Sequence, residues 1–150
     1  MKNNPQRAVP DEDTAKLKNE LYQMAFGTMK QDLKDCRWLE CIAIAESVIS
    51  DRIESVMSKK GFNHTLNTLR QNIVLFKKYA DQRDKDFDEL SELLSNWAIE
   101  GNYALHRMVK VEIGDSLDWN QRLQRMQKTA EEGLSLANKM NNWSKRKYNK

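Results

Sequence analysis

Two polar residues one helical turn apart in the second half of the chain, Asn102 and His106, have types and spacing suited to catalysis. Residues four apart lie on the same face of a helix. An imidazole with an unperturbed pKa of about 6.5 can accept or donate a proton near neutral pH. The spacing therefore allows His106 to act as a general acid or base, with Asn102 orienting the imidazole or binding a phosphate oxygen. The alternative is a packing role for His106, because histidines are commonly half-buried.

Other arrangements typical of catalysis are absent from the sequence. The two histidines and two cysteines do not have metal-ligand spacing, so we expect neither a metal nor a cofactor. No phosphate-binding glycine loop, nucleophile elbow or paired-carboxylate motif occurs. Cys36 and Cys41 are five apart on one predicted helix and would point in different directions, so we expect two free thiols, as in cytoplasmic proteins.

The elements that must position these residues are helices. Both prolines lie in the first ten residues, glycines number only 5, and apolar residues recur every three or four positions. The pattern predicts helices from residue 13 or 14 to near 27, from 32 to 60, from 63 or 65 to 80, from 85 to 110, and from 115 or 116 to 143. The predicted fold class is all-α, an up-and-down bundle of four main helices with a short leading helix.

The domain organisation that we predict is simple. A chain of 150 residues suits one domain. We assign residues 1–12 to a flexible arm, 13–144 to the helical domain and 145–150 to a basic tail. No apolar run approaches about 18 residues, so no segment is expected to span a membrane, and without a signal peptide we expect the cytoplasm. The net charge of +3 is too small to indicate nucleic-acid binding by itself.

Two segments carry a wider resemblance. Residues 38–54 read WLECIAIAESVISDRIE, and residues 94–110 read LSNWAIEGNYALHRMVK. They resemble two helices of the HEPN (higher eukaryotes and prokaryotes nucleotide-binding) domain family: the first core helix, and the helix that carries an arginine, often a following polar residue, and then a histidine. His106 matches the histidine and Asn102 the polar residue. The resemblance spans roughly residues 30–140.

The resemblance implies a helical bundle that dimerises and brings two copies of the motif together in a cleft. It also implies RNA cleavage without a metal, in a toxin–antitoxin or antiviral system, where the histidine and arginine act on the 2′-hydroxyl, the scissile phosphate and the leaving oxygen. We therefore predict His106 as the acid–base, Asn102 as its orienting partner and Glu46 as a further residue facing the cleft. The implied partners are a second copy, an RNA, and an antitoxin or other protein.

The chain departs from the family motif at Gly101, where the arginine is expected. Glycine cannot bind a phosphate through a guanidinium, and it costs about 1 kcal/mol in a helix interior, so we expect a local reason for it. The domain is then a catalytically dead binding protein, an inactivated form of a toxic enzyme, or an enzyme in which Arg107 or Arg52 replaces the missing charge. Arg107 points about 100° away from His106 on the helix, which disfavours it.

Two other classes of function stay open at this stage. One is a non-catalytic helical module that binds or inhibits another protein. The other is a nucleic-acid binder that acts through the basic tail, Lys145–Lys150. The second predicts strongly salt-dependent binding that is lost when the tail is deleted.

Overall fold

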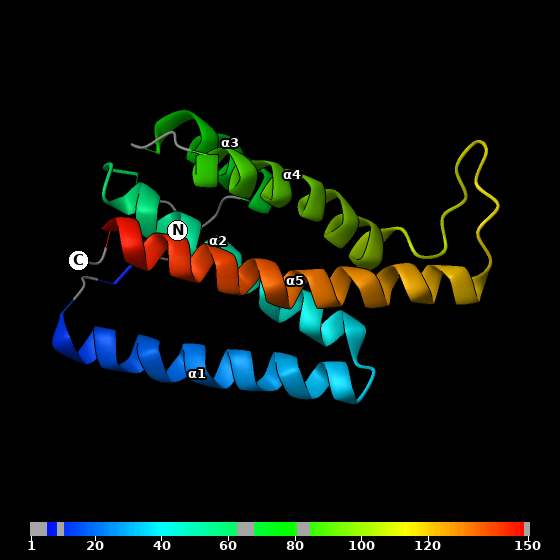
Figure 1. The fold of residues 1–150 in the computed structure, drawn as a ribbon, viewed down its shortest axis with the longest axis horizontal. Coiled ribbons are helices and arrows are strands. Elements are labelled where there is room, and N and C mark those ends of the chain that lie inside the picture. The colour runs from blue at the N-terminus through cyan, green and yellow to red at the C-terminus, as the bar shows by residue number, and fades with distance from the viewer. Residues whose placement is uncertain (1–5, 9–10, 63–67, 81–84, 149–150) are drawn as a thin grey trace, which may run out of the picture.

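A computed structural model describes residues 6–8, 11–62, 68–80 and 85–148 of the chain, and it contains helices and no strand within those ranges. The helices are α1 (Glu12–Lys34), α2 (Trp38–Ser58), α3 (Leu69–Tyr79), α4 (Lys85–His106) and α5 (Trp119–Tyr148) (Figure 1). The prediction of an all-α bundle is therefore confirmed.

Helix α2 lies at the centre of the bundle. It packs against all four other helices, most extensively against α5. Helices α1 and α4 run in one direction and α2 and α5 in the opposite direction, which is an up-and-down arrangement (Figure 1). The apolar stripe of α2 explains its place, because Ile42, Ile49 and Ile53 are fully buried. Burial of such side chains is the main source of stability in a bundle of this size.

The leading helix is longer than predicted. Helix α1 has 23 residues, and Gly27, at which we expected the helix to be interrupted or to end, lies within it. It begins earlier because the Asp11 side chain accepts a hydrogen bond from the backbone N–H of Thr14 at 2.7 Å and caps the helix. The predicted start of the second helix at residue 32 is wrong, since Asp32 belongs to the end of α1. The short helix is α3, with 11 residues.

Capping boxes set two of the other helix starts. In α3, the Thr68 side chain accepts from the backbone of Gln71, whose side chain accepts from the backbone of Thr68. The predicted starts at residues 63 and 65 lie outside the described residues. Asp118 and Gln121 make the same reciprocal pair before α5, at 2.8 and 2.9 Å, so residues 115 and 116 are not the cap.

The ends of α4 and α5 also differ from the prediction. Helix α4 ends at His106 instead of continuing to residue 110. Helix α5 continues to Tyr148, so residues 145–148 of the predicted basic tail are helical. Lysine and arginine in a last turn favour this extension, because they interact well with the partial negative charge of a helix C-terminus.

One buried arginine holds the connection between α4 and α5. Arg122 is 6% exposed and donates hydrogen bonds to the Tyr103 hydroxyl at 2.8 Å and to the Asp115 carboxylate at 2.9 Å. It also donates to the backbone carbonyls of Met108, Lys110 and Leu117. The connection, residues 107–118, projects beyond the helices at the right of Figure 1. The Arg122 guanidinium thus stabilises the conformation of a connection that contains no helix.

Several apolar side chains remain outside the core. On α1, Leu17, Leu21 and Met24 follow the helical repeat but are exposed, at 56%, 59% and 70%. The spacing of Trp119 from Leu123 and Met126 favours the inner face of α5, but Trp119 is also exposed. None of the described helices combines the length and the apolar content that crossing a membrane requires.

Candidate functional site

All three predicted site residues line one cavity of about 330 Å³. Asn102 and His106 reach it from the last turns of α4, and Glu46 reaches it from the middle of α2. Its remaining lining residues come from α2's neighbours α3 and α4 and from the residue that caps α3: Thr68, Leu69, Arg70, Trp97, Ala98, Gly101 and Leu105. The sequence could place Asn102 and His106 on one face, and the fold adds Glu46 to them.

The imidazole of His106 is accessible from solvent. His106 is the last residue of α4, and both it and Asn102 are exposed, whereas Glu46 is half-buried. No hydrogen bond joins the His106 or Asn102 side chain to another described residue. The donors and acceptors of both side chains are therefore available to a ligand. A histidine with a packing role would instead be at least partly buried.

Trp97 forms one wall of this cavity and packs against Gly101. Its indole nitrogen donates to the Thr129 carbonyl at 2.9 Å, which fixes the ring against α5. Gly101 is buried. A methyl group at Gly101 would lie 3.7 Å from the Trp97 ring and 4.0 Å from Ile42, both ordinary contacts. Packing of a β-carbon is therefore not the local reason for glycine at this position.

Two polar neighbours of His106 on α4 belong to a different cluster. Arg125 binds the Glu100 carboxylate through two hydrogen bonds, at 2.7 and 2.9 Å. The same guanidinium lies 3.6 Å from the centre of the Tyr103 ring, and the Tyr103 hydroxyl accepts from Arg122. The hydrogen bond to Glu100 raises the pKa of Arg125 further. Glu100 and Tyr103 thus fix α4 to α5 and take no part in the cavity.

The residue that sequence reasoning missed is Arg70. Arg107 forms an ion pair with Glu112 in the α4–α5 connection, and Arg52 is buried elsewhere, so neither lines the cavity. Arg70 is exposed, lies in the first turn of α3 and faces the cavity that holds His106. The sequence held one signal for it. The spacing of Thr68 and Gln71 fits a capping box, which would have placed Arg70 at a helix start.

The protein is an all-helical bundle in which an imidazole, an amide, a guanidinium and a carboxylate line one cavity. Among the described residues, no group of three or more histidine, cysteine, aspartate or glutamate side chains could hold a metal ion. No protein-family model, curated protein or solved structure matches the chain. Any assignment of function therefore depends on the residues and on the geometry of the cavity.

Proposed function

We propose that the chain is a HEPN-like protein of a toxin–antitoxin or antiviral system, acting in the cytoplasm through a dimer cleft as a metal-independent endoribonuclease or as an inactivated version of one. The observation that supports this proposal is the meeting of His106, Asn102 and Glu46 in one cavity with Arg70. Together these side chains offer a proton acceptor, a neutral hydrogen-bonding group and a positive charge.

The chemistry uses these side chains from two copies of the chain, together with the substrate. The imidazole of His106 takes the proton of a ribose 2′-hydroxyl. The 2′ oxygen then forms a bond to phosphorus, the bond from phosphorus to the 5′ oxygen breaks, and the protonated His106 of a second copy gives a proton to the leaving oxygen. Arg70 binds the non-bridging oxygens, where charge develops. Asn102 orients the imidazole, and Glu46 accepts a hydrogen bond from a sugar hydroxyl.

A second copy can dock next to this cavity. The segment 109–113 follows His106 closely, and its three apolar residues are between 75% and 109% exposed. Apolar residues alternate there with Lys110 and Glu112. Glu112 is ion-paired with Arg107 within the connection, so the exposed apolar side chains are the part of this segment that a second copy would cover. Contact between the two segments would make the two His106 cavities neighbours in a homodimer.

The test is cleavage of a single-stranded RNA by the purified protein in EDTA. Beside the parent we would assay His106→Ala, Arg70→Ala and the control Arg107→Ala, which removes the same charge from the residue next to His106. We expect cleavage with a 2′,3′-cyclic phosphate product, loss in His106→Ala and in Arg70→Ala, and no change in Arg107→Ala. Equal losses in the two arginine variants would contradict the role of Arg70.

A further arm separates an active enzyme from an inactivated one. If the parent does not cleave RNA, we would assay Gly101→Arg alone and combined with His106→Ala. Cleavage by the single variant and none by the double variant would identify an inactivated ribonuclease. If no variant cleaves any RNA tested, the nuclease proposal fails.

A second candidate function, a non-catalytic interaction module, is favoured by a different observation. A mostly apolar groove of about 610 Å³ runs between α1 and α2, lined by Leu17, Leu21 and Ile44 among others. An apolar groove of this kind suits an amphipathic helix of a partner protein. If the helix that this groove receives comes from a second copy, self-association measured by sedimentation should be lost in Leu21→Glu, and this loss together with no RNA cleavage by any variant would favour the interaction module. Loss in Val111→Asp would instead support the dimer through the segment 109–113.

A further inference from the structure

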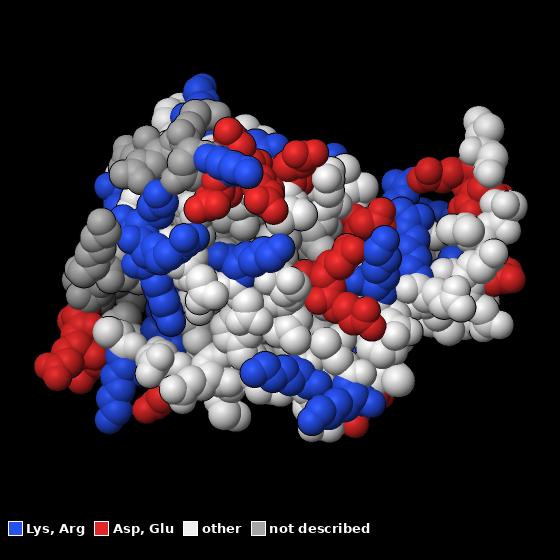
Figure 2. Space-filling view, in the orientation of Figure 1, with Lys and Arg blue, Asp and Glu red and all other residues white. Residues whose placement is uncertain are grey.

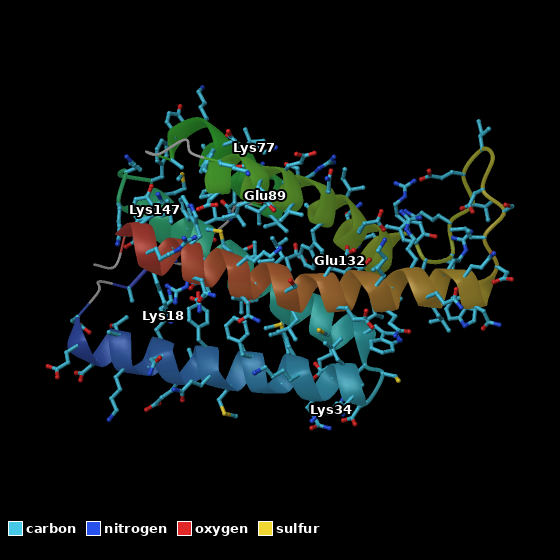
Figure 3. All side chains as sticks on the ribbon, in the orientation of Figure 1. Lys18, Lys34, Lys77, Glu89, Glu132 and Lys147 are labelled. Atoms are coloured by element: carbon cyan, nitrogen blue, oxygen red, sulfur yellow. The ribbon has the colours of Figure 1, made fainter. Side chains whose placement is uncertain are left out.

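A second, larger cavity shares no residue with the one that holds His106. It has a volume of about 720 Å³ and lies between the N-terminal half of α1, the C-terminal half of α2 and the last turns of α5. Its charged and hydroxyl-bearing lining residues are Arg7, Thr14, Lys18, Tyr22, Asp51, Arg52, Glu54, Ser55, Ser58, Lys59 and Lys145. Lys18 lies on the side of α1 that faces α2 and α5, whereas Lys34 points away from them (Figure 3).

The lining of this cavity carries an excess of positive charge. Five lysines and arginines stand against two carboxylates, which leaves a net charge of +3. The whole chain, with 25 basic and 22 acidic residues, also has a net charge of +3. The rest of the chain carries equal numbers of basic and acidic residues, so this lining is more basic than the remainder of the chain as a whole. Lysine and arginine side chains gather at the left of Figure 2, where the starts of α1 and the ends of α2 and α5 meet.

Asp51, one of the two carboxylates that line the cavity, already accepts hydrogen bonds from neighbouring side chains. Asp51 accepts hydrogen bonds from Arg7 at 3.1 Å, from Lys18 at 2.8 Å and from the Tyr22 hydroxyl. Burial would raise the pKa of Asp51, but the hydrogen bonds from Lys18 and Tyr22 outweigh burial and hold it below its usual value. Asp51 is therefore ionised, and its negative charge is paired with Arg7 and Lys18. It does not neutralise the remaining cations of the cavity.

Arg52 is the buried cation without a carboxylate partner. It is 7% exposed, and its Nε has no hydrogen-bond partner. Its guanidinium lies 4.2 Å from the centre of the Tyr22 ring, and no ion pair joins it to another described residue. A buried charge without a partner is costly. The guanidinium fork presents the donor geometry that suits a phosphate.

The fold by itself explains the two outer lysines but not Arg52. Lys59 and Lys145 lie at or near the ends of α2 and α5, where positive charge stabilises a helix C-terminus. Arg52 lies more than a turn before the end of α2 and faces into the bundle. A ligand with negative charge would give the Arg52 guanidinium the partner that the chain does not supply.

We propose that this cavity binds a small phosphorylated molecule, with the phosphate held between Arg52, Lys59 and Lys145. The volume lies within the range of about 300–1,000 Å³ that is common for small-molecule sites, and it is larger than a lone phosphate ion needs. The hydroxyls of Thr14 and Ser55 offer hydrogen bonds to the remainder of the ligand. This site is independent of RNA cleavage at His106.

The test is binding of pyrophosphate and of adenosine monophosphate, measured by titration calorimetry at low salt. We would compare the parent with Arg52→Gln and Lys145→Gln, and use Lys128→Gln as the control. Lys128 and Lys145 both lie on α5, and both are exposed, but only Lys145 lines the cavity. Loss of a charge-assisted hydrogen bond should weaken binding about tenfold or more in Arg52→Gln and less in Lys145→Gln. Lys128→Gln and His106→Ala should bind as the parent does.

Several outcomes would overturn the proposal. They are no binding of either probe at millimolar concentration, equal weakening in Lys128→Gln and Lys145→Gln, and binding of an RNA oligomer without binding of either small probe. Because Arg52 is buried, Arg52→Gln could fail to fold, and the comparison of the two lysine variants then decides. In the parent, the Nε–H resonance of Arg52 should shift when the ligand is added, and an unchanged resonance would also count against the site.

Discussion

Three glycines inside helices provide a quantitative test of the packing around Trp97. A β-carbon at Gly101 would make ordinary contacts at 3.7 and 4.0 Å, and one at Gly27 would meet nothing within 4 Å. At Gly133 it would lie 2.8 Å from the Trp97 ring and 3.1 Å from the β-carbon of Ala45. We expect Gly27→Ala and Gly101→Ala to stabilise the protein and Gly133→Ala to destabilise it.

The magnitudes follow from two opposing effects. Replacing glycine by alanine in a helix interior gains about 1 kcal/mol, and Gly27→Ala measures this gain alone. At Gly133 the Trp97 ring cannot retreat freely, because its indole nitrogen is bonded to the Thr129 carbonyl on the same helix as Gly133. Overpacking of this kind costs about 1–3 kcal/mol. Gly133→Ala should therefore be less stable than Gly101→Ala by about 1–3 kcal/mol.

The assay is urea unfolding followed by circular dichroism, with thermal unfolding as a second measurement. For a chain of this size each kcal/mol corresponds to about 2–4 °C in Tm. If Gly133→Ala proves as stable as Gly101→Ala, the close packing of Trp97 between α4 and α5 is refuted. If Gly101→Ala is destabilising while Gly27→Ala is stabilising, the space described beside Gly101 does not exist.

Three further predictions concern the connection, the thiols and the acid response. Arg122→Lys should lower the free energy of unfolding by about 2–4 kcal/mol and speed hydrogen exchange in residues 107–118, because the lysine cannot replace the bonds of the guanidinium; unchanged exchange would contradict this. In the native state a thiol reagent should modify the exposed Cys36 but not the buried Cys41, whose pKa burial raises to about 11, and equal rates would contradict the fold. The lowered pKa of Asp51 contributes stability above about pH 4 that is lost on further acidification. In Asp51→Asn, the free energy of unfolding measured in urea should therefore change less between about pH 5 and pH 2 than in the parent. The same pH dependence in both proteins would exclude Asp51 as its source.

The centre of the fold could be predicted because its periodicity and its burial agree. In α2, Ile42, Ile49, Ile53 and Val56 recur at helical spacing and all are fully buried. In α4, Phe87, Leu94 and Trp97 also recur at helical spacing and are buried. The prediction that Cys36 and Cys41 share one helix is wrong, since Cys36 lies between α1 and α2. Long helices with wide apolar stripes have one favourable way to pack, so their sequences indicate their place directly.

The periphery could not be predicted in the same way. Leu17, Leu21 and Met24 have the spacing of a buried stripe, but periodicity alone does not say whether a neighbouring element covers that stripe. In the structure α1 uses a different face, on which Tyr22 and Met29 pack against the bundle. The length of α1 was underestimated because we expected Gly27 to interrupt or end the helix. A β-carbon at Gly27 would contact nothing, so this glycine disfavours the helix only through its low helix propensity, and the helix continues through it.

The candidate site shows the same division between local and distant information. Asn102 and His106 share a face of one helix, so their spacing alone predicts that they lie together. Glu46 and Arg70 come from two other helices, and their place beside His106 depends on how α2 and α3 pack against α4. The two arginines named as replacements for the missing charge, Arg107 and Arg52, do not line this cavity, because the sequence alone does not give distances across a bundle.

The two cavities together predict how RNA binding should respond to salt. If RNA binds only at the cavity that holds His106, each protomer offers one phosphate contact. Arg70 makes this contact, because no other described lysine or arginine lines that cavity. Each phosphate contact contributes about −0.7 to the slope of log affinity against log salt for a single strand. A dimer should therefore show a slope of about −1.4, and Arg70→Ala should bring it close to zero. A slope of about −4 or steeper would require RNA to contact the cations around Arg52 as well, and it would count against assigning that cavity to a small phosphorylated molecule.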